Sequence, residues 1–409
     1  MNIRELAFHA TAWLSFTLLL LFVSTQLMAK GSPCGGSLQY LNTQYDLDPV
    51  TRKAFDKVYA GLTDLPVGYS YGGSSQNPWK AAGSGKDMHR MMVAMFKTWC
   101  TSLPGINGDS DNALDPILYF AWVYYQNSAG QDFVQGSDPS DPTKSLETGS
   151  SFLSKWNDEY RHFMDSKQSA KRVREWVKDP RIEIDDYVKT QAKDYKSWNE
   201  FFARNLKSHD DGTYPSRPVT MPERDYVIVS PTDCIMNPLL QVLKLDGNYQ
   251  RQYIENPLQL DTVLDVKNIP ISVNDMLGTV PDEIKKEFVG GNGLTCVLMP
   301  NTYHHFHSPV DGTVIHAEVV KTGTAGTPGT FGYPDFPNWV PLDGNVGRPG
   351  TDFSQFQAFQ RGVIIIKMEY KNLPNEKPEK LVGYVASIPV GLDSVGSVVL
   401  NPDFPLDLS

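Results

Sequence analysis

The chain has 409 residues, of which 40% are hydrophobic and 21% are charged, and its formal net charge is −10 at neutral pH. This length is enough for two or three domains that each bury a core. Phosphate binding depends on clustered positive charge, and the sequence holds no long block of lysine or arginine, which argues against nucleic acid as the main partner.

Residues 1–29 differ from the rest of the chain. Arg4 precedes an apolar run from Ala10 to Met28, and Ala29 is a small residue at which a signal peptidase could cut. This pattern is typical of a signal peptide, while the length of the run leaves an uncleaved membrane anchor as the alternative. Both interpretations predict a chain of the secretory pathway, either secreted or membrane-associated.

The cysteines permit disulfides if the protein is exported. They are Cys34, Cys100, Cys234 and Cys296. Four cysteines can pair in three ways, and their spacing matches no zinc site. Cys296 lies in an apolar run, which predicts a buried free thiol at that position. The disulfide pairing therefore stays open.

Residues 30–190 are predicted to form a helical domain. Asp48-Pro49 can begin a helix, with the aspartate as its cap, and Met88–Trp99 has an apolar face at helical spacing that suits a core. The stretch 136–150 is rich in Ser, Asp, Pro and Gly, which predicts a surface loop. The helix predicted after it carries basic residues on one face, which is either solvated or in contact with anionic lipid head groups. These residues are Lys167, Lys171, Arg174 and Lys178.

Ser197 and Glu200 have the spacing of a capping box, which predicts another helix through Arg204. From about Tyr226 onward, short β-rich runs separated by turns predict mostly strand. The runs are Val227–Val229, Leu294–Met299, Val314–Val320, Val363–Met368 and Leu381–Val390. Thr322–Thr351 is rich in Gly and Pro and is too long for a plain connection, so it predicts a lid or entrance loop. The expected fold class is α+β, with a helical half before a β-rich half.

Three of the eight histidines, His304, His305 and His307, lie within four residues of one another. An imidazole titrates near neutral pH, so it can pass a proton or bind a metal. Alternate residues of an extended segment point to the same side, so His305 and His307 could ligate a metal. Asp233, expected where a strand ends in a turn, could instead orient one histidine for proton transfer. Simple hydrogen bonding in a polar turn is a third interpretation.

Several segments occur in the order and approximate spacing of motifs in the phosphatidylserine decarboxylases. They are Phe201-Phe202-Ala203-Arg204, Ser230-Pro231-Thr232-Asp233, Lys267-Asn268-Ile269-Pro270-Ile271-Ser272-Val273 with Leu277-Gly278, Phe288-Val289-Gly290-Gly291, and Tyr303-His304 with His307-Ser308-Pro309-Val310-Asp311-Gly312. The chain resembles this family over residues 195–400. The resemblance implies a decarboxylase domain over 191–409, and 30–190 looks like the accessory domain of some fungal and bacterial relatives.

The resemblance implies a pyruvoyl-dependent proenzyme of phospholipid biosynthesis, a lyase that converts phosphatidylserine to phosphatidylethanolamine with release of carbon dioxide. In this family an internal serine attacks the preceding glycine carbonyl to generate the pyruvoyl group, and an aspartate–histidine pair supplies the base. By motif position this pair is Asp233 and His307, and His304 would assist decarboxylation or reprotonation. The role of His305 stays open, and no metal is implied.

The family's processing serine follows a glycine in a Gly-Ser-Thr or Gly-Ser-Ser motif, a few tens of residues beyond the strand that here ends near Ser397. Gly396-Ser397 is a Gly-Ser pair, but its context matches that earlier strand, and Gly73-Ser74-Ser75 is expected in a polar loop. The resemblance therefore predicts a decarboxylase domain that is incomplete at its C-terminus. A pyruvoyl cofactor is expected if the chain is completed and not otherwise.

The substrate stays open between phosphatidylserine and a free amino acid, because some relatives with a long helical domain decarboxylate aromatic amino acids. A non-catalytic relative that binds a lipid or amine is a further alternative, and a metal-binding β-barrel enzyme would leave the other motifs unexplained. The partners expected are the phospholipid or amino-acid substrate, a membrane surface and a second copy of the chain in a homo-oligomer.

Overall fold

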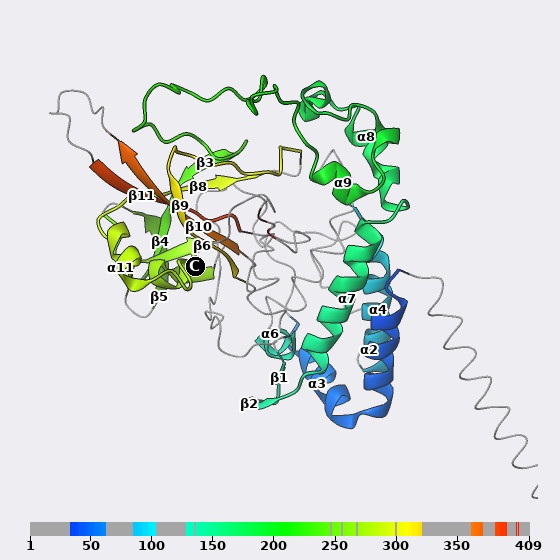
Figure 1. The fold of residues 1–409 in the computed structure, drawn as a ribbon. Coiled ribbons are helices and arrows are strands. Elements are labelled where there is room, and N and C mark those ends of the chain that lie inside the picture. The colour runs from blue at the N-terminus through cyan, green and yellow to red at the C-terminus, as the bar shows by residue number, and fades with distance from the viewer. Residues whose placement is uncertain are drawn as a thin grey trace, which may run out of the picture.

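The computed structural model describes residues 33–62, 85–103, 128–134, 136–245, 248–254, 257–266, 269–298, 301–320, 361–370 and 381–390, with residues 398 and 400. Helices of the first half lie on one side of the molecule and strands of the second half on the other (Figure 1). This arrangement confirms the predicted α+β class and the order of its halves. Within the described ranges, no helix has the length and apolar character needed to cross a membrane. The predicted signal or anchor, 1–29, lies outside these ranges.

The larger helices of the first half pack around one aromatic core. These helices are α2 (Gly35–Leu47), α3 (Pro49–Ala60), α4 (Lys86–Trp99), α6 (Ser128–Val134) and α7 (Thr148–Met164). Trp156 of α7 lies at the centre, with its ring 4.2 Å from that of Trp99 and 5.0 Å from that of Tyr160. Met88, Met92 and Met95 of α4 are buried in the same core, which confirms the predicted apolar face.

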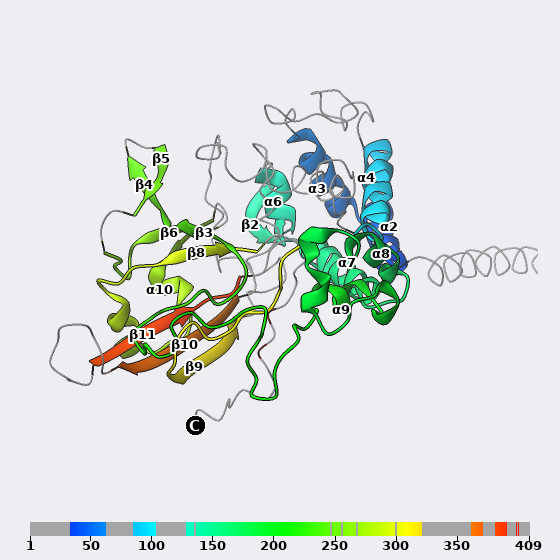
Figure 2. The same cartoon turned by 90° about the horizontal axis from the view of Figure 1, so that it is seen from above.

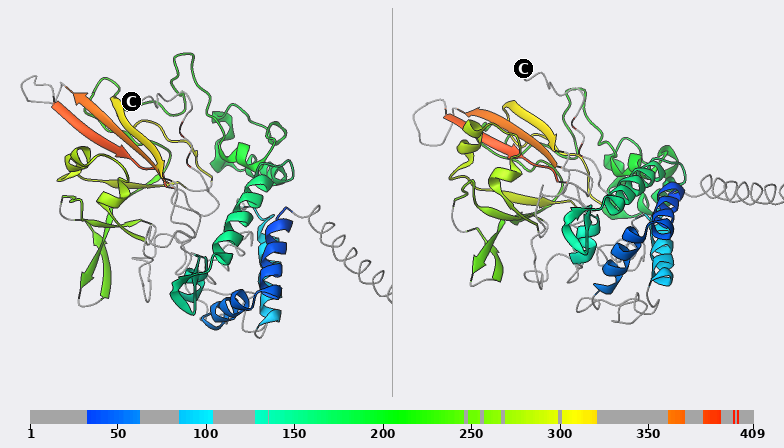
Figure 3. Two further views of the ribbon diagram at one scale, coloured as in Figure 1. Left: turned by 60° about the horizontal axis from the view of Figure 1, so that its bottom comes forward. Right: turned by 90° about the horizontal axis from the view of Figure 1, so that it is seen from below.

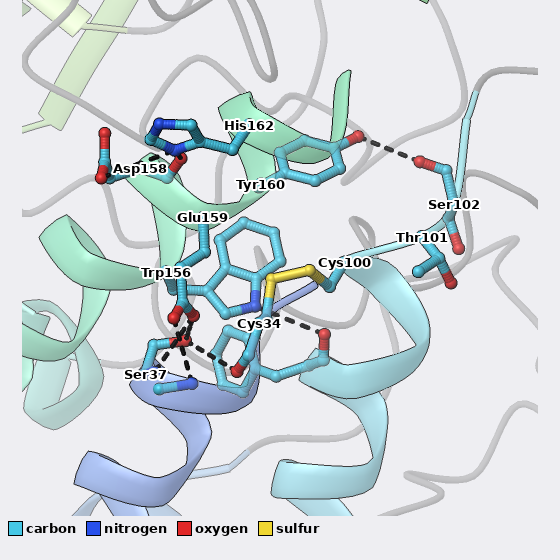
Figure 4. Close-up of a disulfide and its surroundings, with 12 residues drawn as sticks. Cys34, Ser37, Cys100, Thr101, Ser102, Trp156, Asp158, Glu159, Tyr160 and His162 are labelled. Carbon is cyan, nitrogen blue, oxygen red and sulfur yellow. Dashed lines mark hydrogen bonds and ion pairs between the residues drawn. A yellow bond between two sulfur atoms is a disulfide. The ribbon is translucent and has the colours of Figure 1, made fainter. Parts of the chain in front are cut away.

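The ends of these helices are fixed by side chains and by a disulfide. Asp48 caps α3 as predicted, because its Oδ1 accepts from the Val50 amide at 3.0 Å. Glu159 of α7 accepts from the Ser37 amide at 3.1 Å and from the Ser37 hydroxyl at 2.7 Å, so a carboxylate satisfies the N-terminus of α2. Beside it, a disulfide joins Cys34 to Cys100 (Figure 4).

Two local predictions in this half are wrong. The stretch 136–150 is not a plain loop, because β1 (Ser137–Asp138) and β2 (Asp141–Ser145) form a small antiparallel hairpin within it. The predicted basic helix is broken into the end of α7, the 3₁₀ helix η4 (Ser169–Arg172) and α8 (Val173–Trp176). The Ser169 hydroxyl donates to the Met164 carbonyl at 2.8 Å, a side-chain bond that competes with the helical ladder. The basic residues are exposed but do not share one helix.

The chain between α8 and the strands consists of short helices. They are η5 (Pro180–Ile182), η6 (Ile184–Asp186), η7 (Ala192–Asp194) and α9 (Trp198–Phe202). The predicted cap of α9 is confirmed, since the Ser197 hydroxyl accepts from the Glu200 amide at 3.2 Å. Trp198 and Phe201 are buried against Trp176, so α9 belongs to the core of the helical half.

Within the described residues, the strands of the second half form three antiparallel sheets, which lie together in Figure 2. A two-stranded sheet pairs β3 (Ile235–Pro238) with β8 (Leu294–Val297), and a four-stranded sheet has the order β5 (Asn248–Tyr253), β4 (Leu240–Leu245), β6 (Val263–Val266), β7 (Ile269–Ser272). The third has the order β11 (Leu381–Ser387), β10 (Arg361–Tyr370), β9 (Thr313–Val320). The predicted runs at β8, β9, β10 and β11 are thereby confirmed.

Short helices and a buried arginine join the sheets. The helices are α10 (Val273–Met276), α11 (Asp282–Lys285) and η8 (Lys286–Phe288). Arg361 of β10 is 2% exposed, and its guanidinium donates to the Met276 carbonyl at 3.1 Å and to the Asp275 carbonyl at 2.6 Å. The arginine thus adds a donor to carbonyls at the end of α10, of which that of Asp275 also accepts from the Gly278 amide at 3.1 Å.

The run Val227–Val229 is not a strand, contrary to the prediction. The Val227 amide closes a turn by bonding the Arg224 carbonyl at 3.1 Å, and Ile228 is 61% exposed. β-branched residues form a strand only where a partner strand accepts their backbone bonds, and here the Val229 amide bonds a loop carbonyl, that of Pro309. The predicted lid, Thr322–Thr351, lies outside the described residues.

The structure assigns the two disulfides and corrects the prediction for Cys296. Pairing of β3 with β8 sets Met236 opposite Cys296, which brings the Cα atom of Cys234 to 5.1 Å from that of Cys296. This separation is within the usual range for a disulfide, and the two residues are bonded. Cys296 is therefore not a free thiol.

Candidate active site

The histidine segment, defined here as residues 301–309, runs beside the turn that contains Asp233. The His307 amide donates to the Pro231 carbonyl at 2.7 Å, and the Val229 amide donates to the Pro309 carbonyl at 2.9 Å. These bonds hold together two motifs whose bonded residues are 76 and 80 positions apart in the sequence. The structure thus brings the predicted residues Asp233, His304 and His307 into one region.

Arg204 ties the histidine segment to the helical half. Its side chain is 2% exposed, and Nη2 donates to the Asn301 carbonyl at 2.8 Å and to the Thr302 carbonyl at 3.0 Å. The guanidinium also lies over the ring of Tyr187, 4.4 Å from its centroid. The site consequently lies where the helical and strand-rich halves meet. Figure 3 shows both halves in two further views.

The histidines of the segment have different surroundings. The His304 ring stacks on Phe202 of α9 with centroids 3.7 Å apart, and His305 Nε2 lies 3.2 Å from the Ala203 carbonyl oxygen. His307 Nε2 lies 3.1 Å from the Tyr303 hydroxyl. Within the described ranges, no group of three or more His, Cys, Asp and Glu side chains is placed to hold a metal ion.

Burial sets the proton chemistry of His307. Desolvation lowers its pKa, the neighbouring His305 lowers the pKa further, and Asp233 opposes both. His307 is therefore neutral at neutral pH and can accept a proton. Burial raises the pKa of Tyr303, so its hydroxyl keeps its proton at neutral pH, and this hydroxyl and His307 Nε2 share one hydrogen bond in which either group can donate.

The carboxylate of Asp233 is bound by Arg217. Arg217 Nε lies 2.8 Å from Oδ1, and Nη2 lies 2.8 Å from Oδ2. Among the described residues, no hydrogen bond joins Asp233 to His307, so the two predicted partners are neighbours without being bonded. Asp233 also precedes β3, whereas the sequence interpretation placed it at the end of a strand.

Arg217 has further partners that the sequence interpretation missed. Its Nη1 lies 2.8 Å from Asp186 Oδ2, and its Nη2 lies 3.1 Å from Glu183 Oε2. Both acids belong to the helical half, and they are 31 and 34 residues from Arg217 in the sequence. Pairs this far apart leave no periodic or motif signal, so spacing could not have found them.

Ser397, the Gly-Ser candidate for processing, and Gly73-Ser74-Ser75 lie outside the described residues. The roles of Asp233, His304 and His307 therefore stay predictions, although the positions and contacts of these residues are now known. That geometry supplies a proton acceptor, a tyrosine hydroxyl and a carboxylate held by an arginine. Such groups suit proton transfer at a half-buried site.

Comparison with known proteins adds independent information. A family model described as phosphatidylserine decarboxylase matches residues 198–406. The phosphatidylserine decarboxylase proenzyme of Clostridium novyi is 27% identical over 203 residues, which cover 50% of this chain and 54% of that protein. The proenzyme of Clostridium kluyveri is 29% identical over 148 residues, covering 36% of this chain and 41% of that protein.

A third relative, the phosphatidylserine decarboxylase proenzyme of Vibrio parahaemolyticus, is 27% identical over 142 residues, which cover 35% of this chain and 41% of that protein. The chain thus spans about half or less of the length of these relatives. The family match starts at Trp198 in α9, so it includes Arg217, Asp233 and the histidine segment. It does not include Glu183 and Asp186.

Proposed function

Because this chain belongs to the phosphatidylserine decarboxylase family, we propose that it is a carboxy-lyase that converts phosphatidylserine to phosphatidylethanolamine and carbon dioxide. The observation that carries the proposal is the bond from the His307 amide to the Pro231 carbonyl. It sets a neutral imidazole beside the Asp233 turn, as an enzyme that takes a proton from a serine hydroxyl requires.

Enzymes of this family use a pyruvoyl group that is made from one of their own serines. The carbonyl of the pyruvoyl group draws electrons from the bond to the departing carboxylate. The site fits the formation of such a group because His307 is neutral and half-buried, and because a hydrogen bond to the Tyr303 hydroxyl orients its ring. His307 would accept the proton of the serine hydroxyl. His304, held flat on Phe202, would deliver a proton to the carbon that loses carbon dioxide.

Exposed apolar side chains beside the site support a lipid substrate. Ile235 and Met236 of β3 are 55% and 53% exposed, and Leu294 of β8 is 63% exposed. Apolar residues grouped on the surface are typical of places that contact lipid or another protein. Ile235 and Met236 come two and three residues after Asp233, and Leu294 lies on the strand paired with theirs, so acyl chains resting there would leave the head group near the histidine segment.

The disulfides support export, which we also propose. All four cysteines are disulfide-bonded, and such bonds persist mainly in oxidising compartments. An exported enzyme would meet phosphatidylserine at a membrane surface. The segment 1–29 would direct the chain there, as a cleaved signal peptide or as an anchor.

The test uses the chain together with any coding sequence that continues its reading frame past Ser409. The purified protein is expected to split into two fragments, one of which carries an N-terminal pyruvoyl group detectable by intact mass before and after borohydride reduction. It should release carbon dioxide from phosphatidylserine in mixed micelles. His307→Ala and Asp233→Asn should prevent splitting, whereas the exposed-residue control Arg181→Gln should split normally.

The same preparation separates the alternative functions. Release of carbon dioxide from a free aromatic amino acid, with none from phosphatidylserine, would replace the lipid by an amino acid as the substrate. A protein that stays whole and releases no carbon dioxide from either would contradict the decarboxylase proposal. Binding of that protein to phosphatidylserine vesicles would then identify a non-catalytic relative.

A further inference from the structure

Arg217 is shared between the candidate catalytic carboxylate and the helical half of the chain. It chelates both oxygens of Asp233 and also bonds Asp186 and Glu183. Its own side chain is 27% exposed, and those of Asp233 and Asp186 are 29% and 30% exposed. The bonds to Asp233 and Asp186 are therefore partly shielded from solvent, where charge-assisted, bidentate bonds are stronger than on an open surface, whereas the Glu183 side chain is 61% exposed.

The network matters because the proposed chemistry needs Asp233 for another purpose. A carboxylate that orients a catalytic imidazole does so by accepting a hydrogen bond from the ring. Here the lone pairs of Asp233 face Arg217, and the positive charge of the arginine offsets the negative charge that would stabilise a protonated His307. Asp233 lies close enough to act on His307 electrostatically.

We propose that Arg217 is a positioning residue that withholds the Asp233 carboxylate from His307, and that Asp186 and Glu183 of the helical half hold Arg217 in place. The catalytic importance of this arrangement rests on the proposed function, because Asp233 and His307 are the predicted aspartate–histidine pair. Its physical content is independent of catalysis: the arrangement of three acids around one guanidinium sets the basicity of one histidine.

The region outside the family match thereby takes part in the site. Asp186 and Glu183 precede the first matched residue, Trp198, and η6, which contains Asp186, is fixed by backbone bonds to the following segment. The Lys207 amide donates to the Asp186 carbonyl at 2.9 Å, and the Val188 amide donates to the Asn205 carbonyl at 2.9 Å. The acids are consequently held by ordered backbone, which is what a fixed counter-charge for Arg217 requires.

The expected consequence is a change in the pKa of His307. This ring is faced by the Tyr303 hydroxyl, the Tyr214 ring, His305 and Asp233. In Arg217→Gln the freed carboxylate can turn to the imidazole and stabilise its protonated form, so the pKa of His307 should rise by about one unit or more. Arg217→Lys keeps the charge but cannot chelate both oxygens as a fork, so a smaller rise of the same sign is expected.

The experiment is an NMR titration of the full chain labelled at histidine Cε1, with the His307 signal assigned by its loss in His307→Gln. Arg181→Gln is the matched control, because the Arg181 side chain is 55% exposed and pairs with Asp179 rather than with the acids around Arg217, so it should leave the pKa of His307 unchanged. Asp233→Asn is the second control, since adding Arg217→Gln to it should produce only the smaller rise that comes from the lost positive charge. Circular dichroism confirms that each variant folds.

The readout needs no decarboxylation, so the inference can hold or fail apart from the proposed function. If the pKa of His307 rises clearly more in Arg217→Gln when Asp233 is present than in the Asp233→Asn background, the proposal is supported. If it rises equally in the Asp233→Asn background, the effect is that of the lost positive charge alone and the proposal is overturned. An unchanged pKa of His307 in both Arg217→Gln and Arg217→Lys also overturns the proposal. If Arg217→Gln does not fold, the pKa of His307 in Arg217→Lys decides the question.

Discussion

The helical half and the strand-rich half are stabilised in different ways. In the helical half a continuous set of buried side chains runs from Cys34 to Phe201 and is dominated by large aromatic rings. Among the described residues, those of the strand-rich half divide into smaller clusters, such as the one around Ile365 and Leu264 and the one around Ile366 and Val310. We infer that the first half supplies most of the stability, and that the second half depends on polar bonds between its parts.

The candidate site lies where these two kinds of structure meet. Side chains of the helical half hold it in place. Arg204 bonds the histidine segment, and Asp186 and Glu183 bond Arg217. Its predicted catalytic residues come from the loops of the strand-rich half. A stable scaffold that positions side chains on less rigid loops is a common arrangement for active sites.

The largest effect should come from the centre of the aromatic core. Trp156→Ala removes a ring that contacts Trp99, Tyr160 and Phe96, and the resulting cavity should lower the free energy of unfolding by about 4 kcal/mol. Urea denaturation measures this loss. Val188→Ala, at a residue that is 63% exposed, should change it by less than about 0.5 kcal/mol. If Ile365→Ala, in the strand-rich half, lowers the free energy of unfolding more than Trp156→Ala does, the inference that the helical half supplies most of the stability is wrong.

The second prediction concerns acid sensitivity of the helical half. His89 is 3% exposed, stacks on Tyr45 at 3.9 Å, and has its pKa lowered from 6.5 to about 4, mainly by burial. His89 therefore binds a proton below pH 6.5 in the unfolded chain, but only below about pH 4 in the folded chain. The contribution of His89 is constant above pH 6.5, and stability is lost as pH falls from there to about 4.

This loss should amount to roughly 3 kcal/mol across the window. It is measured by urea denaturation of the wild type and His89→Gln between pH 7.5 and 4.5. His89→Gln should unfold more easily at neutral pH but with a flatter dependence on pH. Equal slopes for the two proteins would show that His89 does not titrate as its burial requires, and that other groups cause the acid sensitivity.

The sequence predicted local features better than contacts between distant residues. The caps at Asp48 and Ser197 were predictable because each depends on neighbours within three residues. The strand at Val227–Val229 was predicted wrongly, because its β-branched residues have the right propensity but no partner strand. Motif order indicated that Asp233 and His307 lie together, but nothing local to Asp233 shows that Arg217 holds its carboxylate.

Replacing Arg204 should have a smaller effect on stability, and it tests the contact between the two halves. Arg204→Met keeps an apolar stem but leaves the carbonyls of Asn301 and Thr302 without their donor, which should cost roughly 2 kcal/mol. The larger change should be local. Hydrogen exchange of the His307 amide, which bonds Pro231, should speed up more than that of amides in α7. Arg181→Met, at an arginine whose side chain is 55% exposed, should change neither quantity.

The last prediction compares the two disulfides, which close loops of similar length, 66 and 62 residues. Loop entropy alone would give them nearly equal stabilisation. Their surroundings differ, because Cys34 and Cys100 are 0% exposed within the aromatic core, whereas Cys234 and Cys296 are only half-buried. Thiol–disulfide exchange needs access to a sulfur atom, so the Cys234–Cys296 bond should be reduced first, by a factor of roughly ten or more in rate.

Timed reduction of the folded protein, followed by alkylation and peptide mass spectrometry, measures the order in which the two bonds open. Cys234 directly follows Asp233, so opening its disulfide should also speed hydrogen exchange at the His307 amide, while α2 and α4 stay protected. Reduction of both bonds at one rate would mean that the helical half opens as readily as the strand-rich half. That result would contradict the difference in stability inferred from their cores.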